Sequence, residues 1–129
     1  MALNIQRSTL EPEVEVIAVS GEIDWDTVSG FEDVVQNLFR TNPKVVLADL
    51  REVSYLGSAG ISELLDLNAQ LECRGGRLVV LGKQTGALGA LELVGFGEVA
   101  LIAESMEDAL DLISSLRHKT PPSERPRKN

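Results

Sequence analysis

The chain has 129 residues, of which 43% are hydrophobic and 4% aromatic, so it can bury one core built mainly from aliphatic side chains. Its net charge is −8, and residues 1–116 hold 7 basic and 19 acidic side chains, whereas residues 117–129 hold 5 basic and 1 acidic. An acidic body argues against nucleic acid as the main partner, because phosphates bind basic surfaces, and it favours a partner with a basic patch.

The cellular compartment is predicted from the lone cysteine and the first residues. Cys73 is the only cysteine, which excludes an intramolecular disulfide. The opening MALNIQRSTLEPE lacks the apolar region of a signal peptide, and no apolar run approaches the roughly 20 residues that span a bilayer. We therefore predict a cytoplasmic protein without membrane contact.

The chain begins with two predicted strands. Residues 3–8 alternate weakly between apolar and polar side chains and suggest a short edge strand. Residues 13–20 alternate clearly and predict a second strand that ends at Gly21. One face of this strand collects three apolar residues, Val14, Val16 and Ala18.

A helix is predicted over about residues 26–40. Its apolar positions recur at helical spacing: Val28, Phe31, Val34, Val35, Leu38 and Phe39. Asp24 or Asp26 can cap its start, and Ser29 with Glu32 fits a capping box one turn later, so two starts remain open.

The middle of the chain predicts a strand, a turn and a second helix. KVVLADL (44–50) is nearly all apolar, which is typical of a central strand. REVSYLG (51–57) is interpreted as a turn, and a helix follows over about 59–73, before Gly75. The apolar side of this helix has four residues, Ile61, Leu64, Leu65 and Leu71.

The last elements complete an alternating order of strands and helices. A strand at 77–82, a short helix at 85–94, a strand at 99–103 and a helix at 106–117 are predicted. This order indicates an α/β fold, a mixed β-sheet with about four helices in a single domain over residues 1–116. Residues 117–129 contain three prolines and much charge, which predicts a disordered basic tail.

Catalytic and metal-binding patterns are missing. The only histidine is His118, in the tail, so neither a Ser-His-Asp nor a Cys-His arrangement is available. One cysteine and one histidine do not make a metal site, and the glycines of TGALG (85–89) do not form a phosphate-binding loop. We predict no metal, no cofactor and no enzymatic activity. A small enzyme on an α/β scaffold would need a catalytic group from a second subunit.

Three side chains remain as candidate functional residues. Cys73, near the end of the second helix, is interpreted as a half-buried thiol, with a redox or intermolecular disulfide role as the alternative. Trp25 follows the second strand and either packs on its own domain or anchors a partner. Ser58 stands where the second helix begins, and the residues alone favour a plain N-cap.

A phosphate on Ser58 is the second interpretation of that serine. Phosphoserine carries a charge of about −1.5 to −2, which the exposed N–H groups and positive dipole end of a helix N-terminus accommodate. A partner packed over the helix would have to desolvate that charge. Phosphorylation could therefore block binding without unfolding the domain.

Three sequence blocks resemble the STAS-domain anti-sigma factor antagonists, also called anti-anti-sigma factors. They are VSGEIDWDT (19–27), VVLADLREVSYLGSAGISELL (45–65) and ALGALELVGF (87–96). The resemblance covers about residues 3–116 and implies a STAS-like mixed sheet. Asp49 and Leu50 match the D-L that closes the family's central strand.

The resemblance also implies a function. Such a protein binds an anti-sigma factor, typically a serine protein kinase that holds its own nucleotide, and thereby releases a sigma factor. The family's phosphoacceptor serine matches Ser58, and the aspartate of its G-E-[IL]-D turn, near that serine, matches Asp24. Phosphorylation at Ser58 would end the binding, and a phosphatase would restore it. The implied partner-binding residues are Asp24, Trp25, Gly57, Ser58, Ala59, Gly60 and Ile61.

One position departs from the family pattern. Gly57 stands where the family has an aspartate, which removes a carboxylate beside the serine. The alternative is a STAS interaction module that works without phosphorylation and is regulated otherwise, for example through Cys73. A STAS domain that serves a membrane transporter is a further alternative, although such a domain is normally fused to a transmembrane part.

Overall fold

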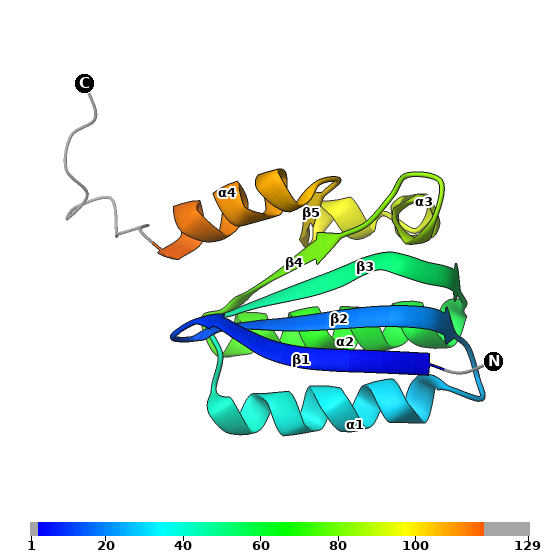
Figure 1. Ribbon diagram of the computed structural model, residues 1–129, viewed down its shortest axis with the longest axis horizontal. Coiled ribbons are helices and arrows are strands. Elements are labelled where there is room, and N and C mark those ends of the chain that lie inside the picture. The colour runs from blue at the N-terminus through cyan, green and yellow to red at the C-terminus, as the bar shows by residue number, and fades with distance from the viewer. Residues whose placement is uncertain (1–2, 118–129) are drawn as a thin grey trace.

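A five-stranded sheet forms the centre of the fold in the computed structural model, which describes residues 3–117 (Figure 1). Its strands, in their order across the sheet, are β1 (Leu3–Glu11), β2 (Val14–Ile23), β3 (Val45–Leu56), β4 (Arg77–Leu81) and β5 (Leu101–Ala103). β1 pairs antiparallel with β2, and all other neighbours pair parallel, so the predicted mixed sheet is confirmed. The predicted tail lies outside the described residues, except for residue 117.

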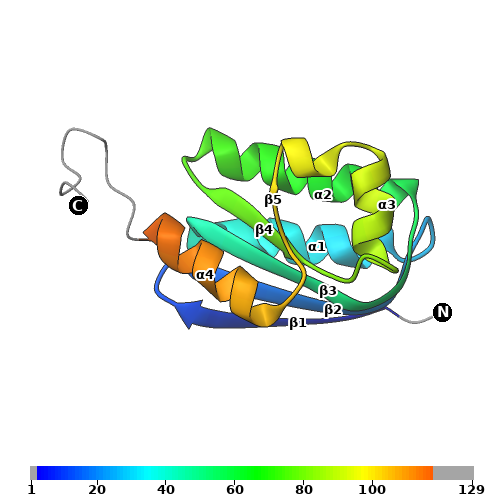
Figure 2. The same cartoon turned by 90° about the horizontal axis from the view of Figure 1, so that it is seen from above.

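Helices cover both faces of the sheet. They are α1 (Val28–Leu38), α2 (Ser58–Cys73), α3 (Ala87–Leu93) and α4 (Met106–Arg117), with short 3-10 helices at Phe39–Thr41 and Phe96–Glu98. α1 and α2 lie side by side on one face, whereas α4 lies on the other (Figures 1 and 2). The predicted alternation of strands and helices is confirmed.

The larger core lies between the sheet and helices α1, α2 and α3. It is formed by alternate strand residues and by one stripe of each helix, including Ile17, Val46, Leu50, Phe31, Leu64, Leu71, Leu88 and Leu91. The opposite strand faces form a smaller core under α4, which includes Val14, Leu47, Val79, Leu81, Ala109 and Ile113. Successive side chains of a strand point to opposite faces of the sheet. Because helices pack on both faces, the strands contribute side chains to both cores.

The second and third strands extend beyond the predicted ends. β2 continues to Ile23, because Gly21 (φ 104°) absorbs a register shift instead of ending the strand. The predicted turn at 51–57 is wrong over most of its length, since β3 runs to Leu56. Val53 and Leu56 are buried in the larger core, and their burial keeps residues 51–56 in the sheet although most of these residues are polar.

Four smaller expectations are corrected. α1 begins at Val28 after Thr27, so the Ser29–Glu32 capping box does not form. β5 begins at Leu101 instead of residue 99. Leu65 is 40% exposed, because α2 buries a narrower stripe than its composition suggests. α3 begins at Ala87, because the two residues before it lie in the turn that leaves β4.

Candidate functional site

The turn between β3 and α2 presents Ser58 at the surface. Gly57, in extended conformation (φ −89°, ψ −180°), occupies the N-cap position, and Ser58 is the first residue of the helix. Ser58 is exposed, and its hydroxyl makes no hydrogen bond to the described residues. The prediction that Ser58 caps α2 is therefore wrong, because the backbone enters the helix one residue earlier. The hydroxyl is left free to react.

The end of β2 holds this turn in place. The Gly57 N–H donates to the Ile23 carbonyl over 2.9 Å, and the Ile61 N–H donates to the Gly57 carbonyl over 3.0 Å. Gly60 lies directly against the strands: a β-carbon there would stand 2.6 Å from Ile23 Cγ2 and 2.7 Å from Leu56 Cδ1. The glycine allows the first turn of α2 to approach the sheet closely, which fixes the position of Ser58.

Asp24 organises the neighbouring turn. Its carboxylate Oδ1 accepts the N–H groups of Asp26 (2.9 Å) and Thr27 (3.1 Å), and the Thr27 hydroxyl donates to the Glu22 carbonyl over 2.7 Å. Asp24 thus satisfies N–H groups at the entry to α1, as expected of a capping carboxylate, although Thr27 occupies the N-cap position. The carboxylate is held inside the turn by these bonds.

Two aromatic side chains near this region are exposed: Trp25, two residues after β2, and Tyr55, one residue before the end of β3. Trp25 is 82% exposed, so of the two interpretations the one in which it packs on its own domain is wrong. Tyr55 is 54% exposed, and no sequence motif indicated it. This position was not apparent from the sequence, because residues 51–56 resemble a turn. In the structure they belong to β3, where Tyr55 pairs with Glu22 of β2 and Leu56 pairs with Ile23.

Two neighbouring carboxyl groups, Glu32 on α1 and Glu63 on α2, were not predicted from the sequence. The pKa of Glu63 is raised to about 7. Burial is the largest cause, followed by the negative charge of Glu32, a hydrogen bond with Glu32 and the charge of Asp66. Glu63 lies five residues after Ser58 on α2, whereas Glu32 belongs to α1. Only the packing of the two helices brings these side chains together, so no local sequence signal could reveal the pair.

Cys73 is the last residue of α2 and is exposed. The expected half-buried thiol is therefore wrong, because Cys73 lies beyond the buried stripe, which includes Leu71. The exposure that a redox role would require is present.

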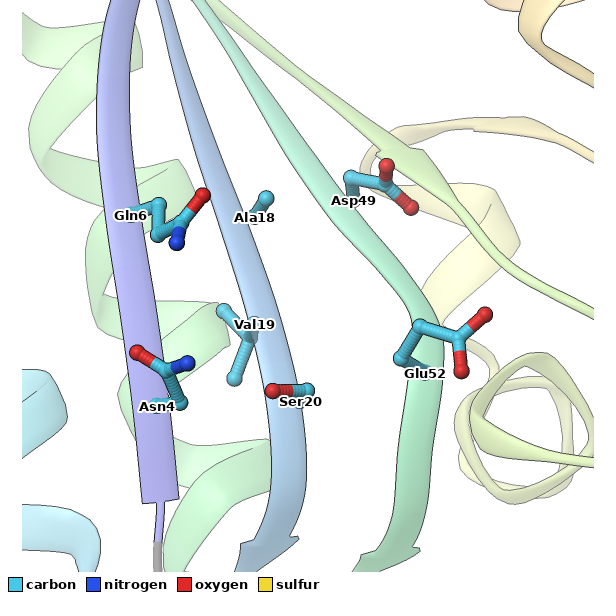
Figure 3. A pocket seen from close by; sticks show the side chains of 7 residues that line it. All are labelled: Asn4, Gln6, Ala18, Val19, Ser20, Asp49 and Glu52. Carbon is cyan, nitrogen blue, oxygen red and sulfur yellow. The ribbon is translucent and has the colours of Figure 1, made fainter.

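A hollow of about 220 Å³ opens over β1, β2 and β3 (Figure 3). It is lined by residues of β1, β2 and β3: Asn4, Gln6, Ala18, Val19, Ser20, Asp49 and Glu52. Burial would raise the pKa of Asp49, but hydrogen bonds from the Arg51 side chain (3.0 and 2.9 Å) and backbone N–H outweigh it and lower that pKa. Asp49 is thus an ionised partner of Arg51, and its neighbour Leu50 is buried in the larger core.

Residues 3–117 have neither a metal-binding cluster nor a membrane-spanning helix. They contain no group of three or more His, Cys, Asp or Glu side chains arranged to hold a metal ion. None of their helices has the length and apolar character needed to cross a membrane.

The proteins that this chain resembles include two anti-sigma factor antagonists from mycobacteria. RsfB of Mycobacterium tuberculosis, an anti-sigma-F factor antagonist, is 25% identical over 97 residues, which cover 75% of this chain and 79% of RsfB. The crystal structure of an anti-sigma factor antagonist from Mycobacterium paratuberculosis superimposes with a TM-score of 0.81 at 24% identity, over 88% of this chain and 95% of that one.

The Bacillus cell fate determinant SpoIIAA has the same fold. Its phosphorylated form covers 85% of this chain and 99% of its own, with a TM-score of 0.65 at 21% identity. The family model described as "Mlab, STAS domain" matches residues 7–104, from the middle of β1 to just beyond β5. The chain therefore belongs to the STAS domain family.

Proposed function

We propose that this protein is an anti-sigma factor antagonist. In its unmodified form it binds an anti-sigma factor of the serine protein kinase type, and the sigma factor held by that partner is released. Phosphorylation at Ser58 ends the binding, and a phosphatase restores it. The similarity to RsfB, which is named an anti-sigma-F factor antagonist, supports this assignment.

The observation that carries the proposal is the position of Ser58. It is exposed at the first turn of a 16-residue helix, and its hydroxyl has no hydrogen-bond partner among residues 3–117. The N–H groups of the first helical turn have no intrahelical acceptors, so they favour an added phosphate. A partner packed against α2 would have to desolvate the same charge, which would oppose binding.

The proposed contact surface consists of Asp24, Trp25, Gly57, Ser58, Ala59, Gly60 and Ile61. Trp25 and Ser58 are exposed and can be contacted directly. Gly60 is buried, and its role is to allow the start of α2 to lie close to the sheet. Ile61 packs partly against the core and links the surface to it. The acidic body favours a partner with a basic surface.

The protein acts in this proposal as a binding protein of the cytoplasm, not as an enzyme. The nucleotide needed for phosphorylation belongs to the partner, which transfers the phosphoryl group to the Ser58 hydroxyl. No metal or cofactor of this chain takes part.

The test is phosphorylation by purified anti-sigma factors of the serine kinase type from the genome that encodes this chain. Each is incubated with ATP and the wild-type protein, Ser58→Ala or Ser62→Ala, and intact mass and binding are measured in parallel. Ser62 is the matched control, because it is an exposed serine on the same helix. We expect one phosphate on wild type and Ser62→Ala, none on Ser58→Ala, and loss of binding with the phosphate.

A STAS interaction module without a phosphorylation switch is the second candidate. Gly57, in place of the family aspartate, and the exposed thiol of Cys73 favour it. Tight binding without any gain of mass would support this candidate and would contradict the switch at Ser58. Treatment of the complex with a thiol oxidant, with Cys73→Ser as control, would then test regulation through Cys73.

A further inference from the structure

Tyr55 stands directly over the residue that precedes Ser58. A β-carbon built on Gly57 would lie 3.0 Å from Tyr55 Cε2, 3.1 Å from its Oη and 3.3 Å from Cζ. These distances are tighter than about nine in ten real contacts of a β-carbon, so the ring would have to shift by a few tenths of an ångström to admit one. The phenol ring of Tyr55 therefore occupies the space into which a side chain at position 57 would project.

The backbone does not explain why position 57 is glycine. With φ −89° and ψ −180°, Gly57 has a conformation that any residue adopts. Gly57 is nevertheless buried although its turn is at the surface, and the ring of Tyr55 is the nearest group above it. Tyr55 and Gly57 are thus a matched pair, in which the aromatic ring takes the place of a side chain at 57.

The same ring is available to a partner. Tyr55 and Trp25 are the exposed aromatic side chains among residues 3–117, and they come from the adjacent ends of β2 and β3. Tyrosine and tryptophan are enriched among the residues that dominate binding energy, because they bury much surface at a small cost in side-chain entropy. Ser58 follows the ring-covered Gly57 directly.

We propose that Tyr55 is a specificity-determining residue of the Ser58 surface, and this inference rests on the proposed function. Its ring, instead of a side chain at position 57, meets the partner, and the partner surface that faces it is apolar. A partner that uses a cationic side chain to bind a carboxylate at position 57 would lack that interaction with this protein, because residue 57 is glycine. A phosphate on Ser58 would bring a charge beside this apolar contact and weaken it.

The test is equilibrium binding of the purified serine-kinase anti-sigma factors to wild type, Tyr55→Ala, Tyr55→Phe and Leu110→Ala, measured by calorimetry. Leu110 is the matched control, because it is exposed (41%) on α4, which packs on the face of the sheet opposite to α2. We expect Tyr55→Ala to weaken binding by about tenfold or more, as for other aromatic interface anchors. Tyr55→Phe, which keeps the ring, and Leu110→Ala should bind as wild type does.

A double-mutant cycle separates this role from a general loss of structure. Gly57→Ala should weaken binding in the wild-type background, because its methyl group displaces the ring, but should have no further effect in Tyr55→Ala. Thermal unfolding must show that each variant remains folded. Because Trp25 is the only tryptophan, 5-fluorotryptophan labelling gives one ¹⁹F resonance that reports contact at this surface directly.

The failure of each idea looks different. If wild type binds and Tyr55→Ala binds equally well, the role of Tyr55 is refuted while the proposed function stands. If Gly57→Ala weakens binding equally with and without Tyr55, the matched pair is refuted. If no anti-sigma factor binds the unmodified wild type, the proposed function and the role of Tyr55 both fail.

Discussion

Gly60→Ala is the substitution that tests most directly how Ser58 is positioned. The new methyl group would stand 2.6 Å from Ile23 Cγ2 and 2.7 Å from Leu56 Cδ1, and both side chains are buried in the larger core. Overpacking of this kind costs about 1–3 kcal/mol. The higher helix propensity of alanine offsets up to about 1 kcal/mol of this cost, so we expect a net loss of up to about 2 kcal/mol.

Gly30→Ala is the matched control, because Gly30 is also in a helix and its β-carbon would meet nothing within 4 Å. It should stabilise the protein by about 0.5–1 kcal/mol. Urea unfolding followed by circular dichroism measures both variants, and opposite shifts of the midpoint at equal slope are expected. If Gly60→Ala were as stable as Gly30→Ala, the close approach of α2 to β2 and β3 would be wrong.

Three further predictions concern single side chains. Glu63 has its pKa raised in the folded state from 4.5 to about 7, so its ionisation destabilises the fold as pH rises through that window. Glu63→Gln should therefore be more stable than wild type at pH 8, by at most about 1 kcal/mol given solvent screening, and equal to it at pH 4; an equal gain at both pH values would contradict the raised pKa of Glu63. Asn68→Ala removes a 3.1 Å hydrogen bond to the Val99 carbonyl and should lower stability by about 1–2 kcal/mol, measured by thermal unfolding. Cys73 should react with a thiol reagent in the native protein nearly as fast as in urea, and slow reaction would show that the end of α2 is covered.

The sequence was sufficient to predict the element order, because each strand and helix carries its own periodicity. Residues 44–50 are nearly all apolar, and the helices show apolar residues at helical spacing. Such signals lie within one element, so they do not depend on which other element it packs against. The mixed sheet and the helices on its faces then follow from the rules of chain connection.

The missed features depend on contacts between distant segments. The polar residues of 51–55 join β3 because Val53 and Leu56 are buried and because β2 continues past Gly21 to pair with them. The Glu32–Glu63 pair exists because α1 lies beside α2. Tyr55 covers Gly57 only once β3 extends to Leu56. No periodicity in the sequence could reveal these contacts.

The way the turn is built explains how a charge at Ser58 could act on binding alone. The groups that hold the turn lie beneath it: the Ile23 carbonyl accepts the Gly57 N–H, and Gly60 packs on the strands. The Ser58 hydroxyl contributes no bond to this arrangement, so a negative charge there would leave these contacts intact and would meet the favourable end of the α2 dipole. Had Ser58 been the helix cap, phosphorylation would have exchanged a stabilising bond for the new charge, and fold and binding would change together. The extended Gly57 takes the capping position and thereby separates the stability of α2 from the chemical state of the serine that follows it.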